Sequence, residues 1–235
     1  MREVRVVLLP GDGIGPEVVG EARRLVDHVS HLDAMQVMWE SHAVGGCAID
    51  TYDKPLPDGV MEACAASHAV LLGAVGGPKW DTTDPDKPRP EQALLALRSG
   101  LGLFANLRPV KPFPSLYEAS PLRKERIEGT DLLVVRELTG GIYFGKSGRE
   151  GDTAYDTCTY SREEVRRVAE VAFESAITRR RKVTSVDKAN VLESSRLWRD
   201  EVNRVATEHP DVELEHMLVD NAAMQDFTYP PRFDL

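Results

Sequence analysis

Cysteine is scarce and irregularly placed in this 235-residue sequence, and its six histidines show no metal-ligand spacing. The three cysteines, Cys47, Cys64 and Cys158, are odd in number and far apart, which argues against a disulfide framework and against a zinc knuckle. No apolar run approaches the roughly 20 residues that a transmembrane helix needs. The N-terminal residues lack the small-residue cleavage site of a signal peptide. These absences favour a soluble protein in the reducing cytoplasm.

The sequence also lacks an excess of basic side chains. Acidic side chains outnumber basic ones by 38 to 29, and the formal net charge is −9. This balance argues against nucleic acid and against an anionic membrane as the main partner. Apolar residues make up 42% of the chain and charged residues 29%, which is typical of a soluble globular protein.

Short apolar runs alternate with segments of helical periodicity along the chain. Residues 4–9 form a β-branched and leucine run, and residues 16–29 carry apolar side chains at helical spacing. Further strands are predicted over 35–43, 69–72, 103–110, 131–137, 183–186 and 213–219. Further helices are predicted over 58–66, 90–98, 161–180 and from before Trp198 to Pro210. This alternation predicts an α/β fold with a mostly parallel sheet.

The second half of the chain carries four more local signals. Residues 142–144 and 154–160 flank a charged, glycine-rich turn and predict a hairpin. Ser161 and Glu164 form a capping box at a helix start. The basic run 179–182 at the end of that helix is expected to be solvated. Residues 232–235 have the composition of a strand start, so we expect the chain to stop within a domain.

The first candidate ligand site is Gly-Asp-Gly-Ile-Gly-Pro at 11–16, between a strand and a helix. The dinucleotide fingerprint G-x-G-x-x-G would place its third glycine at position 16, where this chain has proline. Glu40 offers a ribose-binding acid, but Asp12 within the loop would repel a pyrophosphate. The pattern therefore favours a tight turn with another ligand role over a Rossmann site.

The second candidate is the loop 73–81, Gly-Ala-Val-Gly-Gly-Pro-Lys-Trp-Asp, which follows a predicted strand. Ligands of open α/β sheets bind at the carboxyl ends of strands, and glycines allow the backbone to approach a flat ring. Composition alone supports a mobile loop equally well.

The remaining candidates for binding or catalysis are single polar residues: three arginines, a tyrosine, a lysine and an aspartate. Arg98, Arg108 and Arg136 lie near predicted element ends, and converging guanidinium groups would bind a di- or tricarboxylic acid, although each alone is more typical of a surface ion pair. Three further residues have side chains suited to acid–base work or to a hard cation: Tyr143, Lys188 and Asp220. Taken singly, these three are better explained as part of a capped hairpin, a strand-end charge and a helix N-cap.

Together, the motifs resemble those of the decarboxylating β-hydroxyacid dehydrogenases, the isocitrate/isopropylmalate dehydrogenase family. The segments that carry the resemblance occur in the family's order and spacing: LLPGDGIGPEV, LLGAVGGPKWD, LFANLRPVKPF, VVRELTGGIYFG, VTSVDKANVLE and VDNAAMQ. The second and fourth are highly specific, whereas GDGIGPE marks only the superfamily. The resemblance spans the whole chain.

The resemblance implies an oxidation by hydride transfer to NAD, loss of the β-carboxyl group as carbon dioxide, and protonation of the resulting enolate. Lys188 matches the residue that removes the hydroxyl proton, and Tyr143 matches the residue that protonates the enolate. The three arginines match those that bind the substrate carboxylates. Asp220 matches a residue at the substrate that is also one ligand of Mg²⁺ or Mn²⁺.

The resemblance also implies that NAD binds through loops, without the usual βαβ dinucleotide unit. The residues expected beside the nicotinamide are Ile14, Gly73, Ala74, Val75, Gly76, Gly77, Pro78, Lys79, Trp80 and Asn190. The adenosine-binding loop and two further metal-binding aspartates are expected beyond Leu235.

Substrate choice in the family depends on the helix that begins at Glu91, which is itself expected to contact substrate. Leu94, Leu95 and Val191 would line an apolar pocket for an isopropyl group, worth about 2 kcal/mol for three carbons. The helix lacks the small polar residues with which isocitrate dehydrogenases receive a third carboxylate. The expected substrate is therefore 3-isopropylmalate, with homoisocitrate, tartrate or malate as alternatives.

The resemblance implies two domains, a nucleotide-side domain over 1–102 and a dimerisation and substrate domain over 103–235 with a hairpin arm at about 139–160. In the family, Lys188 and Asp220 reach the site from the neighbouring subunit, so a homodimer is expected. The alternative from another class is an inactive fragment that acts only in dimerisation.

Overall fold

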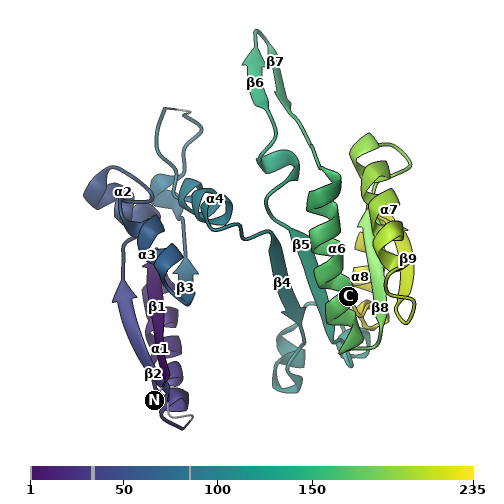
Figure 1. The fold of residues 1–235 in the computed structure, drawn as a ribbon, viewed down its shortest axis with the longest axis horizontal. Helices are drawn as coiled ribbons and strands as arrows, with labels where there is room; N and C mark the ends of the chain where they lie inside the picture. Colours follow the sequence, from purple (N-terminus) through teal and green to yellow (C-terminus); the bar gives the residue numbers. More distant parts are fainter. Residues whose placement is uncertain (1, 33–34, 85) are drawn as a thin grey trace. The chain divides into compact units, whose positions relative to one another are not determined.

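The computed structural model describes residues 2–32, 35–84 and 86–235. The chain forms two compact units, Met1–Leu103 and Phe104–Leu235. Both combine strands with helices, which confirms the predicted α/β class (Figure 1). No helix in the described ranges is both long and apolar enough to cross a membrane.

Unit 1 contains a three-stranded parallel sheet in the order β2-β1-β3. Its elements are β1 (Arg2–Gly11), α1 (Gly15–Leu32), β2 (Met35–Ser41), α2 (Gly46–Tyr52), α3 (Val60–Ala66), β3 (Ala69–Ala74), the 3₁₀ turn η1 (Pro78–Trp80) and α4 (Glu91–Gly100). Val7 and Leu9 of β1 pack with Val60 of α3 and with Ala93 and Leu97 of α4. The carboxyl ends of β1 and β3 therefore carry the two glycine-rich segments to the same edge of the sheet.

Unit 2 contains two antiparallel strand pairs and one parallel pair. Its strands are β4 (Ala105–Val110), β5 (Leu132–Glu137), β6 (Ser147–Glu150), β7 (Thr153–Asp156), β8 (Lys182–Asp187) and β9 (Glu213–Leu218). Its helices are α5 (Lys124–Ile127), α6 (Arg162–Ile177), α7 (Glu193–Ala206) and α8 (Val219–Thr228), with 3₁₀ turns η2 (Pro114–Ala119), η3 (Gly141–Tyr143) and η4 (Pro230–Arg232). Parallel pairing thus holds for β8–β9 and for the sheet of unit 1, whereas β4–β5 and β6–β7 are antiparallel.

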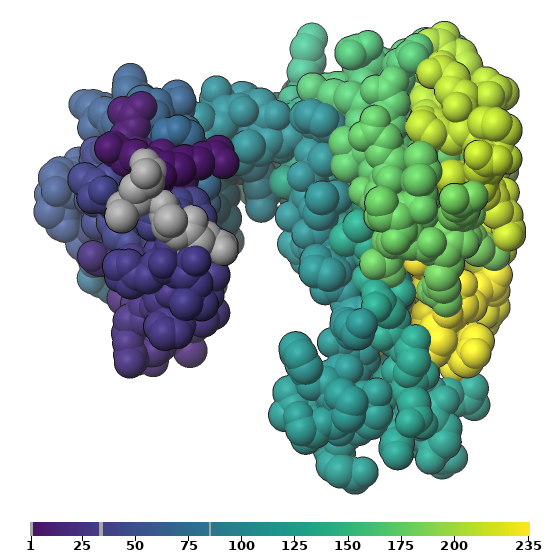
Figure 2. Space-filling view, turned by 60° about the horizontal axis from the view of Figure 1, so that its bottom comes forward, coloured from purple at the N-terminus to yellow at the C-terminus, as the bar shows by residue number. Residues whose placement is uncertain are grey.

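Helix α6 confirms the predicted capping box. The Ser161 hydroxyl accepts a hydrogen bond from the Glu164 N–H at 3.2 Å, and the Glu164 carboxylate accepts one from the Ser161 N–H at 2.7 Å. Phe173 of this helix is fully buried and packs with Val183 of β8 and Val205 of α7. The segment between β4 and β5, drawn in teal, forms a lobe of unit 2 in Figure 2.

The hairpin prediction is correct in existence, but its first strand is wrong and its second strand, predicted over 154–160, ends at Asp156. Residues 147–150 pair with residues 153–156 as β6 and β7, whereas residues 141–143 form the 3₁₀ turn η3. The left-handed backbone of Gly141 (φ 77°), which is buried, favours a tight turn over an extended strand there.

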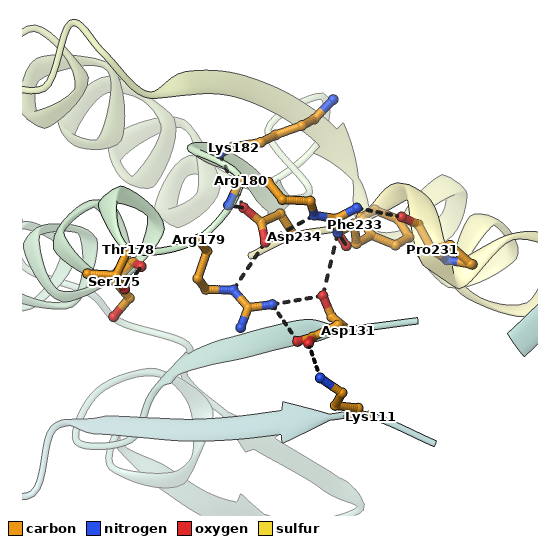
Figure 3. Close-up of polar contacts among 10 residues, drawn as sticks. All are labelled: Lys111, Asp131, Ser175, Thr178, Arg179, Arg180, Lys182, Pro231, Phe233 and Asp234. Carbon is orange, nitrogen blue, oxygen red and sulfur yellow. Dashed lines mark hydrogen bonds and ion pairs between the residues drawn. The ribbon is translucent and has the colours of Figure 1, made fainter. Parts of the chain in front are cut away.

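The basic run at the end of α6 is not simply solvated, which corrects the sequence prediction. Arg179 Nε lies 3.1 Å from Oδ1 of Asp234, which is 1% exposed, and the Arg180 N–H donates to Oδ2 at 2.8 Å (Figure 3). Arg179 also donates to the Asp131 carboxylate at 2.9 Å. A buried carboxylate needs such charged partners because it has lost its hydration.

Asp234 and Leu235 lie between the β4–β5 pair and the β8–β9 pair. The Leu133 N–H donates to the Asp234 carbonyl at 2.9 Å, and the Thr184 N–H donates to the Leu235 carbonyl at 2.7 Å. These residues therefore bond to β5 on one side and to β8 on the other, as a strand start would.

Candidate functional site

A cavity of about 550 Å³ in unit 1 lies between the glycine-rich loop after β3 and the start of α4. The residues that line it are Gly77, Pro78, Trp80, Asp81, Thr82, Arg89, Pro90, Glu91, Gln92 and Leu95. The structure thus brings together five of the predicted cofactor and substrate residues, which are Gly77, Pro78, Trp80, Glu91 and Leu95. Thr82 and Arg89 also line the cavity but were not singled out from sequence, because no local pattern shows that they face it.

The loop and α4 touch at Gly76 and Glu91. Gly76 has φ 101°, and a Cβ built there would lie 2.9 Å from Glu91 Oε1. Glycine at this position therefore permits both the left-handed backbone and the close approach of the Glu91 carboxylate. Glu91 begins α4, where a negative charge interacts favourably with the helix dipole.

The other predicted residues of unit 1 do not line this cavity. Gly73 and Ala74 end β3, and Val75 follows that strand. Ile14 is 63% exposed just before α1, while Leu94 and Arg98 are half-buried on α4.

Lys79 and Trp80 are both held by one side chain of α2. Asp50 Oδ2 accepts from Lys79 Nζ at 2.5 Å, and Oδ1 accepts from Trp80 Nε1 at 3.1 Å. The hydrogen bond from Lys79 is the main cause that lowers the pKa of Asp50. Lys79 is thus engaged with a protein carboxylate, and the Trp80 indole is fixed at the cavity wall.

In unit 2, Arg108 and Arg136 share one face of the β4–β5 pair. Asn106 is the register partner of Arg136, and Arg108 lies two residues further along β4. Such diagonal neighbours have Cα atoms about 7–8 Å apart in antiparallel sheets. Both guanidinium-bearing side chains are exposed, and Arg108 Nε donates to Asn106 Oδ1 at 2.6 Å. Two arginines on one open face can bind a dicarboxylate.

Tyr143 joins this arginine face. The Arg136 guanidinium lies over the Tyr143 ring, with its carbon 5.7 Å from the ring centroid, and the tyrosine is 65% exposed. The phenol is therefore accessible to a ligand held by Arg136.

The turn before Tyr143 is fixed by two residues that sequence reasoning did not select. The buried Glu137 carboxylate accepts from the N–H groups of Thr139 and Gly140 and from Arg167. Tyr160 packs over Gly140 and Gly141, where a built Cβ would lie within about 3 Å of its ring or hydroxyl. Glu137 stands within the segment VVRELTGGIYFG, but its partner Arg167 is 30 residues away in the chain.

Lys188 and Asp220 form a second pair in unit 2. Lys188 Nζ lies 2.5 Å from Asp220 Oδ1, and this hydrogen bond is the main cause that lowers the pKa of Asp220. Next to Lys188, Asp187 is buried and accepts two hydrogen bonds from Arg199, at 2.8 and 2.9 Å. Asn190 and Val191 are exposed in the turn that follows.

The described residues do not by themselves form a complete divalent-metal site. No group of three or more histidine, cysteine, aspartate or glutamate side chains within 2–32, 35–84 and 86–235 has the geometry to hold a metal ion. Asp220 is the one predicted ligand, and its carboxylate is paired with Lys188. Hard cations such as Mg²⁺ need several oxygen ligands, so one aspartate is insufficient.

A family model described as isocitrate/isopropylmalate dehydrogenase matches residues 5–235. The 3-isopropylmalate dehydrogenases of Clostridium acetobutylicum and Prochlorococcus marinus are each 55% identical over all of this chain and 67% of their own length. A crystal structure of isocitrate dehydrogenase from Methylococcus capsulatus matches with a TM-score of 0.80 and 30% identity, over 100% of this chain and 65% of that one. The chain therefore spans about two thirds of the length of these relatives.

Proposed function

Because the chain belongs to the isocitrate/isopropylmalate dehydrogenase family, we propose that the protein carrying this sequence oxidatively decarboxylates 3-isopropylmalate to 4-methyl-2-oxopentanoate and reduces NAD, in leucine biosynthesis. The observation that carries this proposal is the unit 1 cavity. It places Trp80 and the glycine-rich loop opposite Glu91 and Leu95 of α4. A flat nicotinamide ring and a branched apolar group are the ligands that such walls accommodate.

The arginines hold the substrate. Arg108 and Arg136 present two guanidinium groups on one face of the β4–β5 pair in unit 2. Arg98, on α4 of unit 1, is the third arginine that membership of the family assigns to the substrate carboxylates. Bidentate hydrogen bonds to the two carboxylates orient the substrate hydroxyl carbon for hydride transfer to NAD.

Lys188 and Tyr143 move the protons. Lys188 acts as the base in its neutral amine form, after its ion pair with Asp220 has opened and it has given up a proton to solvent, and it then takes the hydroxyl proton as the hydride leaves. Loss of carbon dioxide then leaves an enolate, which Tyr143 protonates from its accessible position beside Arg136. Asp220 would supply one ligand to Mg²⁺ or Mn²⁺, and the bound ion would stabilise negative charge on the substrate oxygens.

Leu94, Leu95 and Val191 set the preference for the isopropyl group. Leu95 lines the cavity, and α4 carries no lysine or arginine before Arg98 that could receive a third carboxylate. Arg89, which precedes the helix, is the one arginine among the residues that line the cavity. Burial of three carbons contributes about 2 kcal/mol.

The protein acts in the cytoplasm as a homodimer in which one copy supplies Lys188 and Asp220 to the other. The Lys188–Asp220 pair and the Arg136–Tyr143 pair share no hydrogen bond or ion pair among the residues that the structure describes. The β6–β7 arm, whose side chains are mostly exposed, is the surface we assign to the dimer contact.

Initial rates with NAD and Mn²⁺ test the proposal. The protein that carries this sequence should oxidise 3-isopropylmalate with a kcat/KM at least about tenfold above that for isocitrate, since an unpaired carboxylate against leucine costs several kcal/mol. Equal values would refute the pocket assignment. Preference for homoisocitrate, tartrate or malate would assign the site to another substrate of the same class.

A further inference from the structure

Asp12 lies in the glycine-rich turn between β1 and α1 and is 3% exposed. Its carboxylate accepts three backbone hydrogen bonds. Oδ2 accepts from the N–H groups of Gly46 at 2.7 Å and Gly76 at 2.8 Å, and Oδ1 accepts from the Cys47 N–H at 2.7 Å. These donors belong to two different segments, so one buried carboxylate ties three parts of unit 1 together.

Two of the donors are the first residues of α2. The first N–H groups of a helix have no partner within the helix, and here Gly45, at the N-cap, supplies no side chain. The Asp12 carboxylate, which comes from the turn between β1 and α1, caps the start of α2 instead. A Cβ at Gly45 would lie 2.6 Å from Asp12 Oδ2, so the carboxylate fills the space that a capping side chain would need.

The third donor is in the loop that lines the cavity. The Asp12 N–H donates to the Ala74 carbonyl at 2.6 Å, and its carboxylate accepts from the Gly76 N–H. Asp12 therefore holds the backbone on both sides of Val75.

Helix α2 in turn holds the far end of the same loop. Asp50 binds Lys79 and Trp80, and the Trp80 ring lies against Gly46, where a built Cβ would fall within 2.4 Å of ring atoms. The start of α2 is fixed by Asp12, so the same carboxylate supports the loop directly at Gly76 and indirectly at Trp80.

We propose that Asp12 is a positioning residue that preorganises the loop 74–80 for the nicotinamide end of NAD. This inference rests on the proposed function, which assigns that loop to the cofactor. A loop held in place before the ligand arrives loses little conformational freedom on binding. Asp12 itself has its oxygens occupied by protein donors, so its contribution is to the shape of the loop.

The substitution Asp12→Asn tests the proposal in the protein that carries this sequence. The amide keeps the size of the side chain but directs an N–H₂ group toward backbone donors. We expect KM for NAD to rise at least about tenfold, while KM for 3-isopropylmalate and kcat at saturating NAD change by less than about threefold. Backbone amides of residues 74–80 should exchange with solvent at least about tenfold faster.

Asp27→Ala is the matched control, because it removes a hydrogen bond from Trp39 Nε1 at 2.7 Å in the same unit without touching the loop. When Asp27→Ala and Asp12→Asn are compared at equal thermal stability, Asp27→Ala should leave KM for NAD unchanged. A similar rise in this control, or an unchanged KM in Asp12→Asn, overturns the proposal. If Asp12→Asn does not fold, Asp50→Asn tests the same support of the loop through α2. A rise of about threefold or more in KM for NAD would support the positioning role, and an unchanged KM would overturn it.

NADH formation tests the proposed function, and hydrogen exchange tests the role of Asp12 independently of it. If the unmodified protein forms no NADH, the exchange of residues 74–80 still decides the role of Asp12. Faster exchange in Asp12→Asn but not in Asp27→Ala supports the anchor, and equal exchange in all three proteins refutes it.

Discussion

Lys188 Nζ lies 2.5 Å from Asp220 Oδ1, although the residues are 32 positions apart and follow different strands. Lys188 comes directly after β8, and Asp220 is the second residue of α8, after β9. The two strands are parallel neighbours, so their carboxyl ends bring the lysine and the aspartate to the same edge. An ammonium group has no free lone pair with which to accept a proton, so the proposed reaction requires Lys188 to leave this pair and to give up a proton to solvent before it acts as the base.

Lys188→Met and Tyr143→Phe should block different steps. The lysine variant lacks the base for the hydroxyl proton and should show no first-turnover NADH burst. The tyrosine variant should show a normal burst followed by steady-state turnover reduced by about 10²-fold or more, because only the enolate acid is lost. Rapid-mixing absorbance at the NADH band separates the two, and a normal burst in Lys188→Met would exclude its role as base.

Leu95→Ala should weaken recognition of the isopropyl group. The half-buried leucine lines the cavity, and loss of its apolar contacts should lower kcat/KM for 3-isopropylmalate by about tenfold, or about 1.4 kcal/mol. Malate lacks the isopropyl group and serves as the internal control, with kcat/KM within about twofold of the unmodified protein. Equal losses for both substrates would show general damage to the site.

Asp234→Asn should destabilise unit 2. The substitution leaves Arg179 beside a neutral buried amide, and the expected loss is about 2–4 kcal/mol in the free energy of unfolding. Asp131→Asn is the matched control, since Asp131 also pairs with Arg179 but is about half exposed, and its loss should be much smaller. Urea titrations of both variants give the comparison, and equal losses would contradict the role assigned to burial.

His216 should make stability fall in mild acid. Burial, and next the positive charge of Arg199, lower the pKa of His216 below its ordinary value of 6.5. Its Nε2 pairs with Asn203 Oδ1 at 2.7 Å, while the buried Nδ1 has no hydrogen-bond partner among the residues that the structure describes. The unfolded chain thus binds the proton more readily than the native protein, so the stabilisation is present above pH 6.5 and is lost as the pH falls through the lowered pKa.

The substitution His216→Gln isolates this contribution. It removes the titrating ring and keeps a polar side chain, so the difference in unfolding free energy between pH 7.5 and pH 5 should be smaller than in the unmodified protein. Urea unfolding at the two pH values measures it. An unchanged difference would assign the acid sensitivity to other groups.

The sequence by itself determined the α/β class, most strands and helices, and the residue types of the site. These features depend on neighbours within a few positions: the apolar run of β1 ends at glycine, and the Ser161–Glu164 box closes over three residues. Only the tertiary structure decided which polar groups meet. Asp12 reaches donors 34, 35 and 64 residues away, and Arg179 binds Asp234 at a separation of 55. No local pattern encodes these partners, because a buried carboxylate is satisfied by whichever donors the packed strands and helices bring to it.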